Sequence, residues 1–287
     1  NGEVVSADSM QIYRRMDIGT AKPTAEEMDG VPHHMIDVAD PEEDFSVARY
    51  VEMASACVDD IFSRGKLPIV AGGTGLYVDS LLSGRTFAAF SPDSSLRKEL
   101  EAELAERGGE AMLSELSRVD PEAAARLHPN DHKRIVRALE VFQQTGKTIS
   151  QHNRETRALP LRYDALTLSL AFQRREDMWA RIDRRVDEMM AAGLAEEVRA
   201  LLDSGVPVRC TAMQAIGYKE MAAALRGGGD VCAAAEEIKL RSRQYAKRQL
   251  TWFRRTEGAK WLFWGPEPDF EAACRTSTKY LEEFGLV

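Results

Sequence analysis

The feature that most constrains this chain is the alternation of short apolar runs with longer segments of helical periodicity. Strand-like runs occur at residues 2–7, 33–38, 67–73 and 165–172, and again in KWLFW from residue 260. Amphipathic helical patterns cover residues 47–63, 76–82, 177–202, 213–225 and 232–254. Strands that alternate with helices in this way predict an α/β fold with a mostly parallel sheet.

One stretch breaks this alternation. From about residue 94 to residue 153 the sequence contains only helical patterns, such as LRKELEAELAERGG and DHKRIVRALEVFQQTGKT. Ser91-Pro92 and a polar stretch that ends at Pro160 mark its two edges. We therefore expect a core domain of residues 1–90 and 160–287 that carries an all-helical insertion of residues 91–159.

The composition restricts the class of protein. The chain has 287 residues, of which 44% are hydrophobic, and its apolar runs are far shorter than the roughly 18 residues that a membrane-spanning helix needs. Its four cysteines contain no CxxC pair, which fits neither a disulfide framework nor a zinc site. We expect a soluble, cytoplasmic protein that is a monomer and has no membrane partner.

The charge is distributed unevenly along the chain. The net charge of −8 argues against a polyanionic partner, yet KLRSRQYAKRQLTWFRR at residues 239–255 holds seven basic residues and no acidic one. A solvated helix face would explain the charges alone. The aromatic residues Tyr245, Trp252 and Phe253 lie among them and favour an interaction with nucleic acid.

Polar residues follow three of the expected strands at the edge where parallel sheets place their ligands, and one of these sets is Gln173-Arg174 after residues 165–172. Asp8, Ser9 and Gln11 come after the first strand, and the AGGTGLY turn at residues 71–77 follows the third. A carboxylate in such a position can act as a general base, although a simple turn-forming role is equally compatible. The glycines and Thr74 suit a phosphate or a base edge, although a tight turn without a ligand has the same pattern.

The sequence TGKT at residues 145–148 superficially resembles a phosphate-binding loop. Val141 stands where the first glycine of GxxxxGK[ST] belongs, and the segment ends a helix instead of following a strand. We predict a helix C-cap at this place. In the same region Lys133 and Arg137 share one helix face and could bind a phosphate backbone.

Six blocks in a fixed order make the chain similar to the bacterial tRNA dimethylallyltransferase family, also called tRNA isopentenyltransferases. They are SADSMQIYRRMDIGTAKPT, VPHHMIDV, AGGTGLYVDSLL, HPNDHKRIVRALEVFQQTGKT, MQAIGYKE and YAKRQLTWFR. The resemblance covers essentially the whole chain. It implies a P-loop nucleotide-kinase-like parallel sheet with a helical insertion that grips the anticodon stem-loop of tRNA.

The implied reaction transfers a dimethylallyl group from dimethylallyl diphosphate to the exocyclic N6 amine of the adenosine adjacent to the anticodon. Diphosphate is released with the assistance of Mg²⁺, for which we assign no protein ligands. The resemblance makes Asp8 the general base. It also implies tRNA contacts at Asp8, Ser9, Met10, Gln11, Thr74, Arg97, Lys133, Arg134, Ile135, Val136, Arg137, Gln214, Ala215, Ile216, Gly217, Tyr218 and Lys219.

The chain departs from the family pattern at its start. The family carries a strand, a GxxxxGK[ST] loop and a helix before the segment that corresponds to Gly2, and this sequence does not contain them. We expect that Asn1 is not the native start. Two other functions remain open at this point, a P-loop kinase of a small metabolite and a non-catalytic RNA-binding relative.

Overall fold

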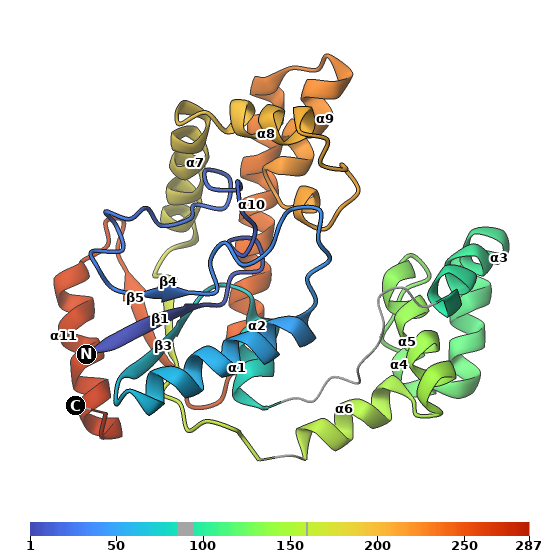
Figure 1. Ribbon diagram of the computed structural model, residues 1–287, viewed down its shortest axis with the longest axis horizontal. Coiled ribbons are helices and arrows are strands. Elements are labelled where there is room, and N and C mark those ends of the chain that lie inside the picture. Colours follow the sequence, from blue (N-terminus) through green and yellow to red (C-terminus); the bar gives the residue numbers. More distant parts are fainter. Residues whose placement is uncertain (85–94, 159, 287) are drawn as a thin grey trace. The chain divides into compact units, whose positions relative to one another are not determined.

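Figure 1 shows the computed structural model, which describes residues 1–84, 95–158 and 160–286. The chain divides into two compact units, one made of Asn1–Leu82 and Asp164–Val287 and the other of Ser83–Tyr163. Both expected domain boundaries, after residue 90 and after residue 159, fall at residues outside the described ranges. The described part of the second unit contains helices only.

The strands of the first unit are parallel. They are β1 (Gly2–Ser6), β2 (His33–His34), β3 (Leu67–Ala71), β4 (Leu168–Phe172) and β5 (Lys260–Trp264). The order β2-β1-β3 forms one sheet, and β4 and β5 form another. The parallel arrangement is as predicted, but within the described residues the strands form two sheets instead of one. Each sheet leaves large apolar side chains exposed, namely Ile69, Leu170 and Phe263.

Helices cover these sheets and extend beyond them (Figure 1). In the first unit they are α1 (Val47–Ser63), α2 (Gly75–Leu82), α7 (Arg175–Ala191), α8 (Leu194–Asp203), the short η1 (Ala212–Gln214), α9 (Tyr218–Gly227), α10 (Val231–Phe253) and α11 (Phe270–Phe284). α1 packs on β1 and β3, whereas α10 packs against α7, α9 and α2. None of the described helices has the length and apolar content needed to cross a membrane.

Glycines with positive φ divide two segments that the sequence pattern predicted as continuous helices. Gly193 has φ +101° and separates α7 from α8, and Gly217 has φ +99° and precedes α9. Such φ values strain residues that carry a Cβ, so glycine is suited to these breaks. The predicted strand at residues 33–38 is also shorter than expected, because Met35 and Asp37 have positive φ and β2 ends at His34. α11 was not among the expected elements.

The second unit is built from α3 (Ser95–Val119), α4 (Pro121–Ala124), α5 (His132–Thr145) and α6 (Ile149–Arg157). Its core is apolar and is formed mainly by α3 and α5; its largest fully buried side chains are Leu100, Met112, Leu116, Ile135 and Leu139. α5 ends at Gly146, which has φ +71° and donates its N–H to the carbonyl of Phe142. The interpretation of TGKT as a helix C-cap is therefore confirmed.

A buried carboxylate ties the first sheet together. Glu3 on β1 is only 2% exposed and accepts hydrogen bonds from Arg64, Lys66 and His34. Arg64 directly follows α1, Lys66 directly precedes β3, and His34 lies on β2. The hydrogen bonds, those of Arg64 first, hold the pKa of Glu3 far below its ordinary value of 4.5.

This lowered pKa predicts how stability depends on pH. A carboxylate with a lowered folded pKa contributes stability that is present above about pH 4.5 and is lost as the pH falls further. We expect Glu3→Gln to reduce the free energy of unfolding at neutral pH and to make its fall in acid shallower. Urea unfolding at several pH values measures both. Glu26→Gln, at an exposed position, is the control, and equal pH profiles for parent and Glu3→Gln would contradict the assignment.

Candidate active site

The carboxylate of Asp8 is held in a turn directly after β1. Its Oδ1 accepts the backbone N–H of Met10 at 2.8 Å and that of Gln11 at 3.3 Å. This is the turn-forming role that aspartate often has. No hydrogen bond to Oδ2 is found within the described part of the chain, and the residue is half-buried. One oxygen thus fixes the turn while the other remains able to accept a proton.

The glycine-rich turn between β3 and α2 lies against the Asp8 turn. Thr74 Oγ1 accepts the backbone N–H of Ser9 at 3.0 Å and donates to Ser9 Oγ at 3.2 Å. The backbone N–H of Thr74 donates to the carbonyl of Ala7 at 3.1 Å. A Cβ on Gly72 would lie 2.4 Å from the carbonyl carbon of Ala7, so this approach requires glycine. Asp8, Ser9 and Thr74 are therefore brought together at one strand edge.

α10 packs over the same turn. Gln249 Nε2 donates to the carbonyl of Gly73 at 2.9 Å, and Trp252 Nε1 donates to Asp79 Oδ2 at 2.9 Å. A Cβ on Gly75 would lie 2.3 Å from the Trp252 ring, so the indole rests on the backbone at the start of α2. The glycines of AGGTGLY serve helix packing here, in addition to shaping the turn.

Tyr245 on α10 reaches the Asp8 site, which the sequence reasoning did not predict. Its hydroxyl interacts with Thr74 and Gln249, and partial burial, assisted by the nearby charge of Asp8, raises its pKa, although 37% of the residue is exposed. The sequence did carry a signal for this arrangement. Residues 245, 249 and 252 are spaced by four and three, which places them on one helix face.

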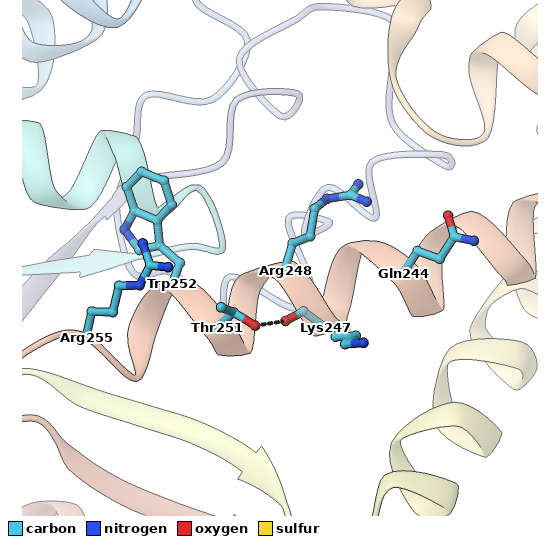
Figure 2. A pocket seen from close by; sticks show the side chains of 6 residues that line it. All are labelled: Gln244, Lys247, Arg248, Thr251, Trp252 and Arg255. Atoms are coloured by element: carbon cyan, nitrogen blue, oxygen red, sulfur yellow. Dashed lines mark hydrogen bonds between the residues drawn. The ribbon is translucent and has the colours of Figure 1, made fainter. Parts of the chain in front are cut away.

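A pocket of about 430 Å³ lies along the second half of α10. Figure 2 shows the side chains that line it. It is lined by Gln244, Lys247, Arg248, Thr251, Trp252 and Arg255. We call this site the α10 pocket. Trp252 is 38% exposed, so part of its indole is open to the pocket although its Nε1 is engaged. A partly exposed indole among cations suits stacking with a nucleic-acid base.

The basic run divides into two halves with different partners. In the first half Lys239 pairs with Asp187 and Glu236, Arg241 with Glu237, and Arg243 with Asp183. In the second half Lys247, Arg248 and Arg255 make no ion pair within residues 1–84, 95–158 and 160–286. The α10 pocket therefore carries uncompensated positive charge, although the chain as a whole has a net charge of −8.

Gln11 was expected to contact tRNA, but its side-chain amide is hydrogen-bonded to other groups of the protein. Its Oε1 accepts the Ser6 hydroxyl at 3.2 Å. Its Nε2 donates to the carbonyls of Thr20 at 3.3 Å and Ala21 at 3.1 Å. The side chain thus braces the loop that follows Asp8. Met10, the neighbouring expected contact, is half-buried.

The structure corrects the prediction that every residue from Gln214 to Lys219 offers its side chain to tRNA. Tyr218 is fully buried and Ala215 is 7% exposed, so these two side chains face the interior instead of a ligand. Gly217 is also buried, and Ile216 is half-buried. Of the segment, only Gln214 and Lys219 are exposed, and Gln214 Nε2 donates to the carbonyl of Val208.

A similar correction applies to α5 in the second unit. Ile135 and Val136 are 0% and 1% exposed and belong to its apolar core, so their side chains face the interior instead of a ligand. Arg137 pairs with the buried Glu140, and Arg97 on α3 lies 3.8 Å from the same carboxylate. The expected cations Lys133 and Arg134 are exposed on the surface of α5.

Parallel strands with a carboxylate turn and a glycine-rich strand-to-helix turn at one edge define an α/β protein with its candidate site at the carboxyl ends of the strands. Within this class the chain belongs to the IPP transferase family, whose pattern residues 11–256 match. The family resemblance found in the sequence is therefore confirmed.

Individual relatives agree with this assignment. The chain is 45% identical to the tRNA dimethylallyltransferase of Acetivibrio thermocellus over 286 residues, which covers 100% of this chain and 91% of the relative. The crystal structure of the full-length tRNA isopentenylpyrophosphate transferase from Bacillus halodurans aligns with a TM-score of 0.72 and 42% identity, covering 99% and 88% of the two chains. A eukaryotic dimethylallyltransferase acting on tRNA aligns with a TM-score of 0.79 and 28% identity, covering 99% and 74%.

The close approach at Gly72 predicts a sensitive position. Because the atoms that a new Cβ would meet are backbone, Gly72→Ala should lower the free energy of unfolding by about 1–3 kcal/mol. Gly227→Ala is the matched control, since a Cβ there has open space around it. Urea unfolding of both variants measures the difference. Equal stabilities would show that the two turns do not constrain each other.

Proposed function

We propose that this protein transfers a dimethylallyl group from dimethylallyl diphosphate to the exocyclic N6 amine of the adenosine next to the anticodon of tRNA. The family and the names of its relatives support this reaction. The observation that carries it is the carboxylate of Asp8, held by backbone N–H groups through Oδ1 with Oδ2 left to act. That the protein acts as a monomer stays a prediction.

Asp8 serves as the general base in this proposal. The adenine leaves its stack so that N6 can reach the site. N6 forms a bond to the allylic carbon while the bond from that carbon to the diphosphate oxygen breaks, and the electron pair of that bond leaves with diphosphate. Asp8 Oδ2 takes the proton from N6. The N–H groups of Met10 and Gln11 fix the orientation of the carboxylate before the substrate arrives.

Breaking the carbon–oxygen bond places negative charge on diphosphate, which Mg²⁺ neutralises when bound. Among the described residues no group of three His, Cys, Asp or Glu side chains could hold a metal ion. The described residues therefore offer no preformed cluster of three such side chains for the ion. Mg²⁺ commonly binds through substrate phosphates, water and one or two carboxylates. We propose that it enters with the diphosphate, and no step assigned to Asp8 depends on it.

We further propose that the α10 pocket binds the RNA substrate. Its cations can neutralise backbone phosphates, and Trp252 offers a face for an unpaired base. In the second unit, the exposed Lys133 and Arg134 on α5 are the proposed phosphate contacts. We do not propose Arg97 and Arg137 as phosphate contacts, because both already face the carboxylate of Glu140.

Incubation with labelled dimethylallyl diphosphate, Mg²⁺, ATP and unmodified tRNA tests the proposed function directly. Label in the tRNA, located by nuclease digestion and mass spectrometry to the adenosine next to the anticodon, is the expected result. Transfer of the ATP γ-phosphate to a small metabolite would instead indicate a kinase. Retention of tRNA without any transfer would indicate a binding protein.

Removal of the proposed base should affect chemistry more than binding. Asp8→Asn retains an acceptor for the Met10 and Gln11 N–H groups but loses basicity, so we expect the single-turnover rate to fall by about 10²–10⁴. The dissociation constant for tRNA should change much less. Asp29→Asn, at an exposed position, is the control. An unchanged single-turnover rate in Asp8→Asn would exclude the role.

The α10 pocket predicts a salt-dependent contribution to RNA binding. Lys247→Ala and Arg248→Ala should each weaken tRNA binding and lower the slope of log K against log salt by about 0.7–0.9 per lost phosphate contact. Arg241→Ala should have a smaller effect, because Arg241 is already paired with Glu237. Filter binding or fluorescence anisotropy over a salt series measures the slopes. Identical slopes for all three variants and the parent would contradict a role for the pocket.

A further inference from the structure

Glu197 on α8 accepts hydrogen bonds from three consecutive backbone N–H groups of the loop that follows the Asp8 turn. Its Oε2 accepts from Asp17 at 2.9 Å and from Ile18 at 2.8 Å, and its Oε1 accepts from Gly19 at 3.2 Å. Hydrogen bonds to an ionised acceptor are stronger than neutral ones. A single carboxylate therefore determines the path of the loop at residues 17–19.

Tyr218 fixes the carboxylate in turn. Its hydroxyl donates to Glu197 Oε1 at 2.5 Å, and burial together with the charge of Glu197 raises its pKa far above 10, so it remains a donor. The ring also packs directly on the loop, since a Cβ on Gly19 would lie 2.5 Å from it. α8 and α9 thus hold the loop through both a hydrogen-bonded and a steric contact.

The same loop is connected to Asp8 through Gln11. The carbonyls of Thr20 and Ala21, next to the residues bound by Glu197, accept the two hydrogen bonds from Gln11 Nε2. Gln11 in turn donates its backbone N–H to Asp8 Oδ1. A continuous series of hydrogen bonds and short backbone segments therefore runs from Glu197 to the proposed base.

We propose that Glu197 is a positioning residue for the transfer reaction. It fixes residues 17–21, these residues orient Gln11, and Gln11 holds the Asp8 turn in the geometry that aligns Oδ2. Glu197 does not touch the substrate and acts only through this series. The role in transfer rests on the proposed function, whereas the mechanical link from Glu197 to the Asp8 turn does not depend on it.

Amide hydrogen exchange tests the mechanical link. In Glu197→Gln the charge is lost and an amide NH₂ faces backbone donors, so the amides of Asp17, Ile18 and Gly19 should exchange about tenfold faster or more. The decisive amides are those of Met10 and Gln11, which Glu197 does not contact and which should also exchange faster. Glu196→Gln, the exposed neighbour on α8, is the matched control and should alter neither set. Unchanged exchange at residues 10 and 11 would overturn the inference.

Steady-state kinetics test the consequence for the reaction. Glu197→Gln should lower kcat by roughly 10–100-fold with KM for both substrates nearly unchanged, because a misplaced group costs rate more than binding. Tyr218→Phe keeps the ring and should give a smaller loss in kcat and in amide protection. The double variant should match Glu197→Gln, since Tyr218 acts through that carboxylate. A lowered Tm with an unchanged kcat would reduce Glu197 to a stabilising residue and overturn the proposal.

Amide hydrogen exchange and steady-state kinetics together distinguish a failure of this inference from a failure of the proposed function. If the parent protein transfers no dimethylallyl group, the proposed function fails, and amide exchange still decides whether Glu197 positions the Asp8 turn. If Glu197→Gln does not fold, Tyr218→Phe carries both measurements. In that case its exchange at residues 10 and 11 must rise above that of the parent, and an unchanged value would contradict the inference.

Discussion

The structure of the site depends on the contact between two turns at the end of neighbouring parallel strands. The backbone N–H of Ala7 donates to the carbonyl of Ala71, and that of Thr74 donates to the carbonyl of Ala7. The Thr74 hydroxyl then binds Ser9. These bonds require the backbones to meet at Gly72, where a side chain would not fit. Because they are mostly backbone bonds, they place Asp8 with little freedom.

Around this contact, some polar residues stabilise the fold and also have a role in the proposed function. Asp8 shapes its turn with one oxygen, and in the proposed function its other oxygen accepts a proton. α10 neutralises its first basic half with acidic partners and leaves its second half positive beside the same turn. Asp8 and the α10 pocket belong to the same compact unit, and in the proposed function a nucleobase and a phosphate chain bind to this one unit.

The sequence allowed the fold class, the strand-end position of Asp8 and the C-cap at Gly146 to be predicted, because each rests on a local pattern or on an ordered set of motifs. It could not show that the strands form two sheets, since pairing depends on contacts far apart in the chain. Motif blocks also mark a segment without saying which side chains face inward. Tyr218 and Ile135 were therefore taken as contacts although both are fully buried. Glu197 lies in no quoted motif, and its hydrogen bonds to the backbone of residues 17–19 and to the Tyr218 hydroxyl reveal it.

The central claim is that a carboxylate oriented by its own turn accepts the proton of the attacking amine. A crystal structure of the protein with an anticodon stem-loop and an unreactive dimethylallyl diphosphate analogue measures this most directly. The account predicts that Asp8 Oδ2 lies within about 2.6–3.2 Å of the adenine N6, or reaches it through one water molecule. A complex with the base bound and the carboxylate beyond that range, with no bridging water, would contradict it.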